Sequence, residues 1–133
     1  MPAGTYEELL PCTGKLRVRS QDWEIEYYFP GPDHRYKGTF VRIPAASVGE
    51  YVTAFADNWR EYARLKAAIP PGGEFTKSGS CGMTIRIGGF RQGVCLRDYH
   101  MPIESEAQLE KVVSGYKYAA DRAPQIQRFL AAL

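Results

Sequence analysis

The sequence has no long apolar run and few cysteines, and each shortage excludes a class of protein. No apolar stretch approaches the roughly 20 residues that a membrane-spanning helix needs. The N-terminal segment MPAGTYEELLPCTGK has neither a basic start nor a long apolar stretch, so it is not a secretory signal. The three cysteines, Cys12, Cys81 and Cys95, are an odd number at spacings typical of no disulfide framework. We therefore expect a reduced, cytoplasmic protein that does not bind a membrane.

Concentrated basic charge is also missing. The net charge is +2 and the isoelectric point is near 8.4. Dedicated nucleic-acid binders usually have an isoelectric point above about 9 and clustered Lys and Arg. Here the 17 basic residues are spread along the chain, with no run longer than two. A nucleic-acid partner is therefore disfavoured.

The spacings that hold metals and phosphates are absent as well. His34, Cys81, Cys95 and His100 show none of the paired-ligand spacings of zinc sites. The glycine-rich segment GGFRQG at 88–93 lacks the lysine of a P-loop. It also joins two predicted strands, whereas the P-loop and the dinucleotide-binding motif G-x-G-x-x-G both lead from a strand into a helix. We therefore interpret it as a hairpin turn. The zinc-deaminase pattern is not found either. We expect no cofactor and no metal.

Length and composition predict one globular domain over residues 1–133. The chain weighs 15.0 kDa, with 44% hydrophobic and 24% charged residues, which is ordinary for a globular protein. A chain of this size buries about two thirds of its extended surface. That is enough for a core without metals or disulfides.

Alternation of apolar and polar residues predicts five strands. The first two flank Ser20-Gln21-Asp22, a link short enough for a tight hairpin. A third strand ends at Pro44, and the last two flank the glycine turn at 88–92. The predicted strands cover Lys15–Arg19, Trp23–Phe29, Thr39–Ile43, Met83–Ile87 and Gly93–Arg97.

Two helices complete the prediction. The first begins with a capping box of Ser47 and Glu50 and ends near Ile69, before Pro-Pro-Gly-Gly. The second begins near Ser105, and Pro124 predicts a kink or a break in it. The order is βββ-α-ββ-α without internal repeats. It predicts an α+β fold with a mostly antiparallel sheet of about five strands and both helices on one face.

Such a sheet has an outer face rich in arginine and aromatic residues. Cross-strand ion pairs alone explain Arg17 and Arg19 opposite Glu24 and Glu26. The excess of arginine beside exposed rings favours instead a binding face for an acidic or neutral protein surface, or for a small anionic ligand. The predicted binding residues are Arg17, Arg19, Tyr28, Phe40, Arg42, Arg86 and Arg97, with His34, Arg35 and Tyr36 from the loop at 30–38.

A catalytic alternative depends on Cys81, which lies in the flexible segment Ser78-Gly79-Ser80-Cys81-Gly82. In this hypothesis His100 is the base and Asp98 orients it. Asp98 and His100 are only two residues apart, so the backbone must bend for both to act together.

The leading hypothesis is a non-enzymatic binding protein that occludes or sequesters a protein partner. As a compact α+β chain without a catalytic signature, it resembles small bacterial proteins that neutralise toxins or regulate other proteins, such as immunity proteins and phage-encoded inhibitors. The apolar residues after Pro124 would pack on the chain's own core or against a second copy, so a homodimer stays open.

Overall fold

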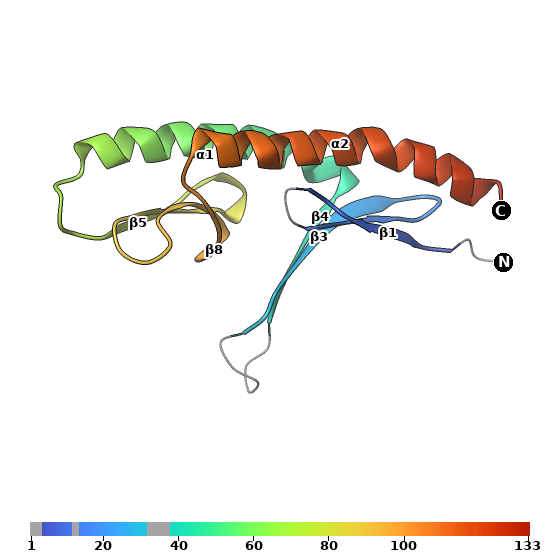
Figure 1. The fold of residues 1–133 in the computed structure, drawn as a ribbon, viewed down its shortest axis with the longest axis horizontal. Helices are drawn as coiled ribbons and strands as arrows, with labels where there is room; N and C mark the ends of the chain where they lie inside the picture. The colour runs from blue at the N-terminus through green and yellow to red at the C-terminus, as the bar shows by residue number, and fades with distance from the viewer. Residues whose placement is uncertain (1–3, 12–13, 32–37) are drawn as a thin grey trace. The chain divides into compact units, whose positions relative to one another are not determined.

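The chain passes twice through the same series of elements, four strands followed by a long helix. The computed structural model describes residues 4–11, 14–31 and 38–133. Within these ranges the first series is β1 (Tyr6–Leu9), β2 (Lys15–Val18), β3 (Trp23–Phe29), β4 (Thr39–Pro44) and α1 (Val48–Ala68) (Figure 1). The second is β5 (Phe75–Ser78), β6 (Thr84–Ile87), β7 (Gly93–Arg97), β8 (His100–Ile103) and α2 (Glu106–Ala131). Short 3-10 turns at Ala45–Ser47 and Ser80–Gly82 precede α1 and β6.

Each set of four strands forms its own antiparallel sheet. In the described residues the strand orders are β1-β2-β3-β4 and β5-β6-β7-β8, so each strand pairs with its neighbour in sequence. The α+β class and the antiparallel pairing are confirmed. The prediction of one sheet of about five strands is wrong, because the described strands divide into two sheets of four.

The five predicted strands are all present, and the three additional ones have little sequence signal. β1 has two glutamates among its four residues, and β5 is FTKS, exposed along its whole length. β8 contains Pro102, which is tolerated because β8 is an edge strand. Short edge strands of this kind lack the apolar alternation that reveals a strand in a sequence.

The structure contains two compact units. The first unit comprises residues 1–48 and 114–133, and the second comprises residues 49–113. α1 follows the first sheet in sequence but belongs to the second unit. α2 contributes its beginning to the second unit and its remainder to the first. The single domain over 1–133 stays a prediction.

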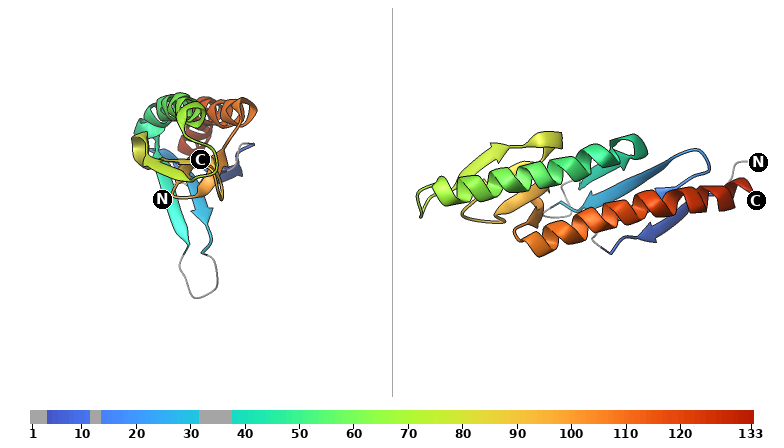
Figure 2. Two further views of the ribbon diagram at one scale, coloured as in Figure 1. Left: turned by 90° about the vertical axis from the view of Figure 1, so that its left-hand side faces the viewer. Right: turned by 90° about the horizontal axis from the view of Figure 1, so that it is seen from above.

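In the first unit, α2 covers the inner face of β1–β4 (Figure 2). Its buried positions recur every three or four residues, which is the spacing of one helix face. The hydroxyl groups of Tyr27 on β3 and Tyr116 on α2 form a buried hydrogen bond of 2.8 Å. The apolar core of this unit includes Leu16, Val18, Ile25, Val41, Ile43, Tyr116, Ala119, Ala123, Ile126 and Leu130.

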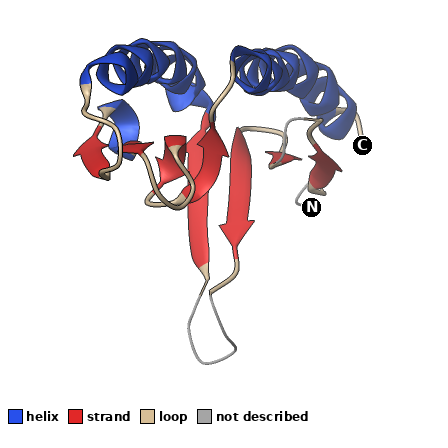
Figure 3. Cartoon of the chain, turned by 60° about the vertical axis from the view of Figure 1, so that its left-hand side comes forward, coloured by secondary structure: helices blue, strands red, loops and turns tan. Residues whose placement is uncertain are grey.

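In the second unit, α1 lies on one face of β5–β8; it is the left-hand of the two blue helices in Figure 3. Phe55 and Tyr62 are buried on α1, in agreement with the predicted apolar stripe. They share the core with Met83, Ile85, Val94, Leu96 and Ile103 from the strands and Val112 from the start of α2.

Helix α2 continues through Pro124 from Glu106 to Ala131, so of the predicted kink or break the break does not occur, and the kink stays a prediction. Of the apolar residues after this proline, Ile126 and Leu130 are buried, whereas Phe129 and Leu133 are exposed. Within the described part of the chain, no helix is long and apolar enough to cross a membrane.

Candidate binding face

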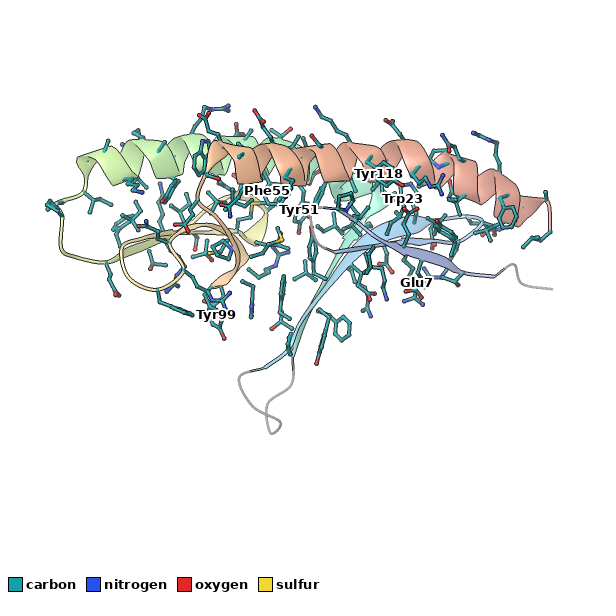
Figure 4. The ribbon with its side chains drawn as sticks, viewed as in Figure 1. Glu7, Trp23, Tyr51, Phe55, Tyr99 and Tyr118 are labelled. Carbon is teal, nitrogen blue, oxygen red and sulfur yellow. The ribbon has the colours of Figure 1, made fainter. Side chains whose placement is uncertain are left out.

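The outer face of the first sheet carries two rows of alternating charge. The strand register places Glu7, Arg17 and Glu24 side by side across β1, β2 and β3. The next row along the strands is Leu9, Lys15, Glu26 and Arg42. Figure 4 shows Glu7 on the side of the sheet turned away from α2, and Trp23 and Tyr118 on the helix side. We call this surface, made of Glu7, Leu9, Lys15, Arg17, Glu24, Glu26, Tyr28, Phe40 and Arg42, the outer face.

Glu26 is the centre of the charges on the outer face. Only 8% of Glu26 is exposed, and its carboxylate lies 3.1 Å from Arg42 Nε, 3.7 Å from Arg17 Nη1 and 3.8 Å from Lys15 Nζ. Lys15 also pairs with Glu7 at 2.5 Å, and its hydrogen bond lowers the pKa of Glu7. The cross-strand ion pairing expected from the sequence is confirmed. It also holds the cationic groups in fixed positions around a buried anion.

Beyond this charged cluster the outer face becomes aromatic. Tyr28 and Phe40 are direct neighbours across β3 and β4, with ring centroids 4.7 Å apart. They are 56% and 54% exposed, and the Arg42 guanidinium lies 5.1 Å from the centre of the Phe40 ring. We call Tyr28, Phe40 and Arg42 the aromatic end. An exposed pair of rings with a guanidinium stacked on one of them is typical of interface centres rather than of solvated sheet faces.

A hollow lies beside the aromatic end, where β3 extends past the first residue of β2. β2 begins at Lys15, opposite Glu26, and β3 runs on to Phe29. The hollow has a volume of about 330 Å³. Its lining consists of Leu9, Gly14, Lys15, Glu26, Tyr27, Tyr28 and Phe29.

The described part of the predicted binding residues is divided between the two units. Arg17, Tyr28, Phe40 and Arg42 share the outer face, and Arg19 lies just after β2 with Asp22 and Glu24 as partners. Arg86 and Arg97 belong to the second sheet and so to the second unit. His34, Arg35 and Tyr36 lie outside the described residues.

Arg97 has a structural role within the second unit. Its guanidinium donates hydrogen bonds to the carbonyl oxygens of Cys81 and Leu96, at 2.8 and 2.9 Å. It also donates to the Tyr51 hydroxyl at 2.7 Å. These bonds tie the Cys81 turn to β7 and α1. Binding by Arg97 stays a prediction, but its guanidinium is already committed to three acceptors.

The Cys81 turn does not have the geometry of an activated thiol. The Cys81 thiol donates to the Glu50 carbonyl oxygen on α1 at 3.8 Å. Burial raises the pKa of Cys81, the Glu50 carboxylate adds to this increase, and Arg97 opposes it. A raised pKa lowers the fraction of thiolate at neutral pH, which is the reverse of what a nucleophilic cysteine needs.

The proposed partners of Cys81, His100 and Asp98, lie in and beside the β7–β8 turn. His100 begins β8, where its ring lies 4.5 Å from the Tyr99 ring. Asp98 lies in the β7–β8 turn with a positive φ of 52°, so the backbone bends here as the hypothesis required. Catalysis by Cys81, His100 and Asp98 stays a prediction.

A second surface cluster was missed by the sequence analysis. Phe90, Arg91 and Tyr99 come together where the β6–β7 loop meets the β7–β8 turn. The sequence signal was the pair Phe90-Arg91 inside the glycine loop, which we interpreted only as a turn. The loop itself is a hairpin connection, as predicted.

Among the described residues, no three His, Cys, Asp or Glu side chains are grouped so as to hold a metal ion. Comparison with known proteins gives no relative: no family model, no curated protein and no solved structure matches this chain.

Proposed function

We propose that this chain is a non-enzymatic binding protein that occludes or sequesters a protein partner through its outer face. The observation that carries the proposal is the aromatic end, Tyr28, Phe40 and Arg42. Two rings that leave about half of their surface in water have no role in the core of the first unit. Burying such rings against a partner stabilises the complex by roughly 25 cal/mol for each Å² of apolar surface removed from water.

The fixed charges around Glu26 support the same function. Arg42 is half exposed, and it is oriented by both Glu26 and Phe40 before any partner arrives. A side chain that is already ordered loses less conformational entropy when it binds. The neighbouring hollow offers a recess for one apolar side chain of the partner.

Within this function, the favoured class is an immunity-type or inhibitor-type protein of a bacterium or phage that acts in the cytoplasm. Its partner has an acidic or neutral surface at the contact. The three cations of the outer face, Lys15, Arg17 and Arg42, are matched by Glu7, Glu24 and Glu26, but Glu26 is buried whereas the Arg42 guanidinium is half exposed at the aromatic end. A small anionic ligand would meet the same cations but would leave Tyr28 and Phe40 without a purpose. The protein partner is therefore preferred.

The test is an affinity capture from the native host with the tagged full chain, followed by mass spectrometry. The decisive variant is Phe40→Thr, which removes the exposed ring and keeps a residue that favours strands. We expect one stoichiometric partner with the wild-type chain and its loss with Phe40→Thr.

Phe129→Gln is the matched control, because Phe129 is 58% exposed on α2 and lies off the outer face. It should capture the partner as the wild-type chain does. Equal capture by Phe40→Thr and by the wild type would remove the aromatic end from the interface. A wild-type chain that captures no protein would contradict the proposed function as a whole.

A further inference from the structure

In the second unit, the side chains of Phe90, Arg91 and Tyr99 pack against one another at the surface. Arg91 lies over two rings at once, 5.0 Å from the centre of Phe90 and 5.8 Å from that of Tyr99. The two rings are 6.2 Å apart. Phe90 is 66% exposed, and Figure 4 shows Tyr99 on the side of the strands turned away from α1.

Hydrogen bonds hold the loop that carries the cluster. Gly88 N–H donates to Gln92 Oε1 at 3.0 Å, and Arg86 Nε donates to the Phe90 carbonyl oxygen at 3.4 Å. The position of Arg91 is therefore set by the loop and by the two rings.

Backbone strain is concentrated around the same cluster. Among the described residues, four other than glycine have a positive φ: Cys81, Arg91, Asp98 and Met101. Three of these lie in the β6–β7 loop, the β7–β8 turn and the start of β8, which together form the cluster and its support. Strained residues of this kind persist where the surrounding structure fixes them, and they gather at binding sites.

The chemistry of the cluster selects its ligand. A guanidinium has five N–H donors in its plane, and the ring contacts of Arg91 use its faces and leave this edge available. Within the described part of the chain, no carboxylate is ion-paired with Arg91. A planar guanidinium can bind a carboxylate through two parallel hydrogen bonds. The two rings beside it can then pack against the apolar part of the peptide that carries the carboxylate.

We infer that Phe90, Arg91 and Tyr99 form a second docking point, which takes a side-chain carboxylate from an acidic segment of a protein partner. Arg91 binds the carboxylate through its N–H edge, and the two rings cover the apolar part of the segment. A nucleic acid is the weaker candidate, because Arg91 already lies over both rings and the chain's positive charge is not clustered. The inference rests on the proposed binding function, but its test does not need the partner.

The test titrates the ¹⁵N-labelled full chain with a capped hexaglutamate peptide and follows the amide signals by NMR. Hexaglutamine is the uncharged control, and an oligothymidine is the nucleic-acid control. We expect hexaglutamate to shift amides between residues 86 and 101, and hexaglutamine to leave them in place. The variant is Arg91→Asn, since asparagine tolerates a positive φ and preserves the loop.

Arg91→Asn should weaken hexaglutamate binding by about tenfold, the value of one charge-assisted contact. Arg60→Asn, a change of an exposed arginine on α1 beside Asp57, should leave the affinity unchanged. Unshifted amides at 86–101, equal affinity of Arg91→Asn and wild type, or tighter binding of oligothymidine would each overturn the inference. If instead Phe40→Thr keeps its captured partner while hexaglutamate shifts 86–101, the outer face fails and this docking point stands.

Discussion

The Cys81 thiol lies against a backbone carbonyl in a turn that Asn58 and Arg97 hold by hydrogen bonds. Asn58 Oδ1 accepts the Ser80 N–H at 3.0 Å, and its amide donates to the Ser80 carbonyl and the Met83 sulfur, both at 3.2 Å. Arg97 binds the carbonyl of Cys81 itself. A Cβ on Gly79 would lie 2.5 Å from Asn58 Oδ1, so this position needs glycine.

The raised pKa of Cys81 leads to the first prediction at this scale. Iodoacetamide should label Cys81 more slowly at pH 7 than it labels cysteine in an unstructured peptide, because less of the thiol is ionised. Cys95 should be slower still, since burial raises its pKa to about 11. Mass spectrometry of each cysteine peptide against time and pH gives the rates. Labelling of Cys81 faster than the peptide reference would revive the nucleophile hypothesis.

Removal of the Asn58 side chain should loosen the turn. Asn58→Ala deprives the partly buried Ser80 N–H of its acceptor, so the free energy of unfolding should fall by about 1–3 kcal/mol. Urea denaturation measures the change. Asp57→Ala, next to it and exposed, should cost less than about 0.5 kcal/mol. Similar values for both variants would show that the Asn58 bonds do not stabilise the fold.

At the scale of elements, one ionic contact links the edge strand β5 to α1. Glu61 on α1 accepts hydrogen bonds from Arg64 at 2.7 Å and from Lys77 on β5 at 2.9 Å. The bonds from Arg64 and then Lys77 lower the pKa of Glu61 from 4.5 to about 2. Because β5 is exposed along its length, this contact is one of the few that anchor its side chains.

The lowered pKa predicts the direction of a pH effect. A carboxyl whose pKa is lower in the folded chain stabilises the fold above about pH 4.5, and this stabilisation is lost as the pH falls toward 2. In Lys77→Gln the Glu61 pKa should rise toward 4.5, and the loss of stability should begin at a higher pH. Carboxyl-detected NMR titration gives the pKa. An unchanged pKa in this variant would show that Arg64 alone is responsible.

The elements that the sequence predicted are those with strong internal patterns. In the sequence β3 has a long alternation of apolar and polar residues and α1 a long apolar stripe at helical spacing, and their predicted bounds agree with the structure. β1, β5 and β8 are stabilised mainly by a neighbouring strand rather than by their own composition, so a pattern search misses them. For the same reason the division into two sheets was not predictable.

The candidate site was predictable only in part. The alternation of β2, β3 and β4 correctly placed Arg17, Tyr28, Phe40 and Arg42 on a common face. That Arg86 and Arg97 belong to a different sheet depends on which strands pair, which the alternation of residues does not determine. The cluster around Arg91 joins a loop to a turn, and no local spacing indicates such a contact.

At the scale of the whole molecule, the path of the chain sets which pieces can fold. Residues 49–113 are continuous and contain all of the second unit, whereas the first unit needs residues 1–48 together with 114–133. A fragment of residues 49–113 should therefore fold alone and give a dispersed NMR spectrum. A fragment of residues 1–72 should not fold, because the inner face of its sheet lacks α2. A dispersed spectrum from residues 1–72 would contradict this view of the two units.

The same chain path has a consequence for synthesis on the ribosome. The first sheet leaves the exit tunnel early, but the helix that covers it follows only after the 65 residues of the second unit. At ordinary translation rates this delay is roughly 3 to 13 s. During that time the nascent chain exposes Leu16, Ile25 and Ile43 to solvent, so a chaperone that binds short apolar strands could bind it there.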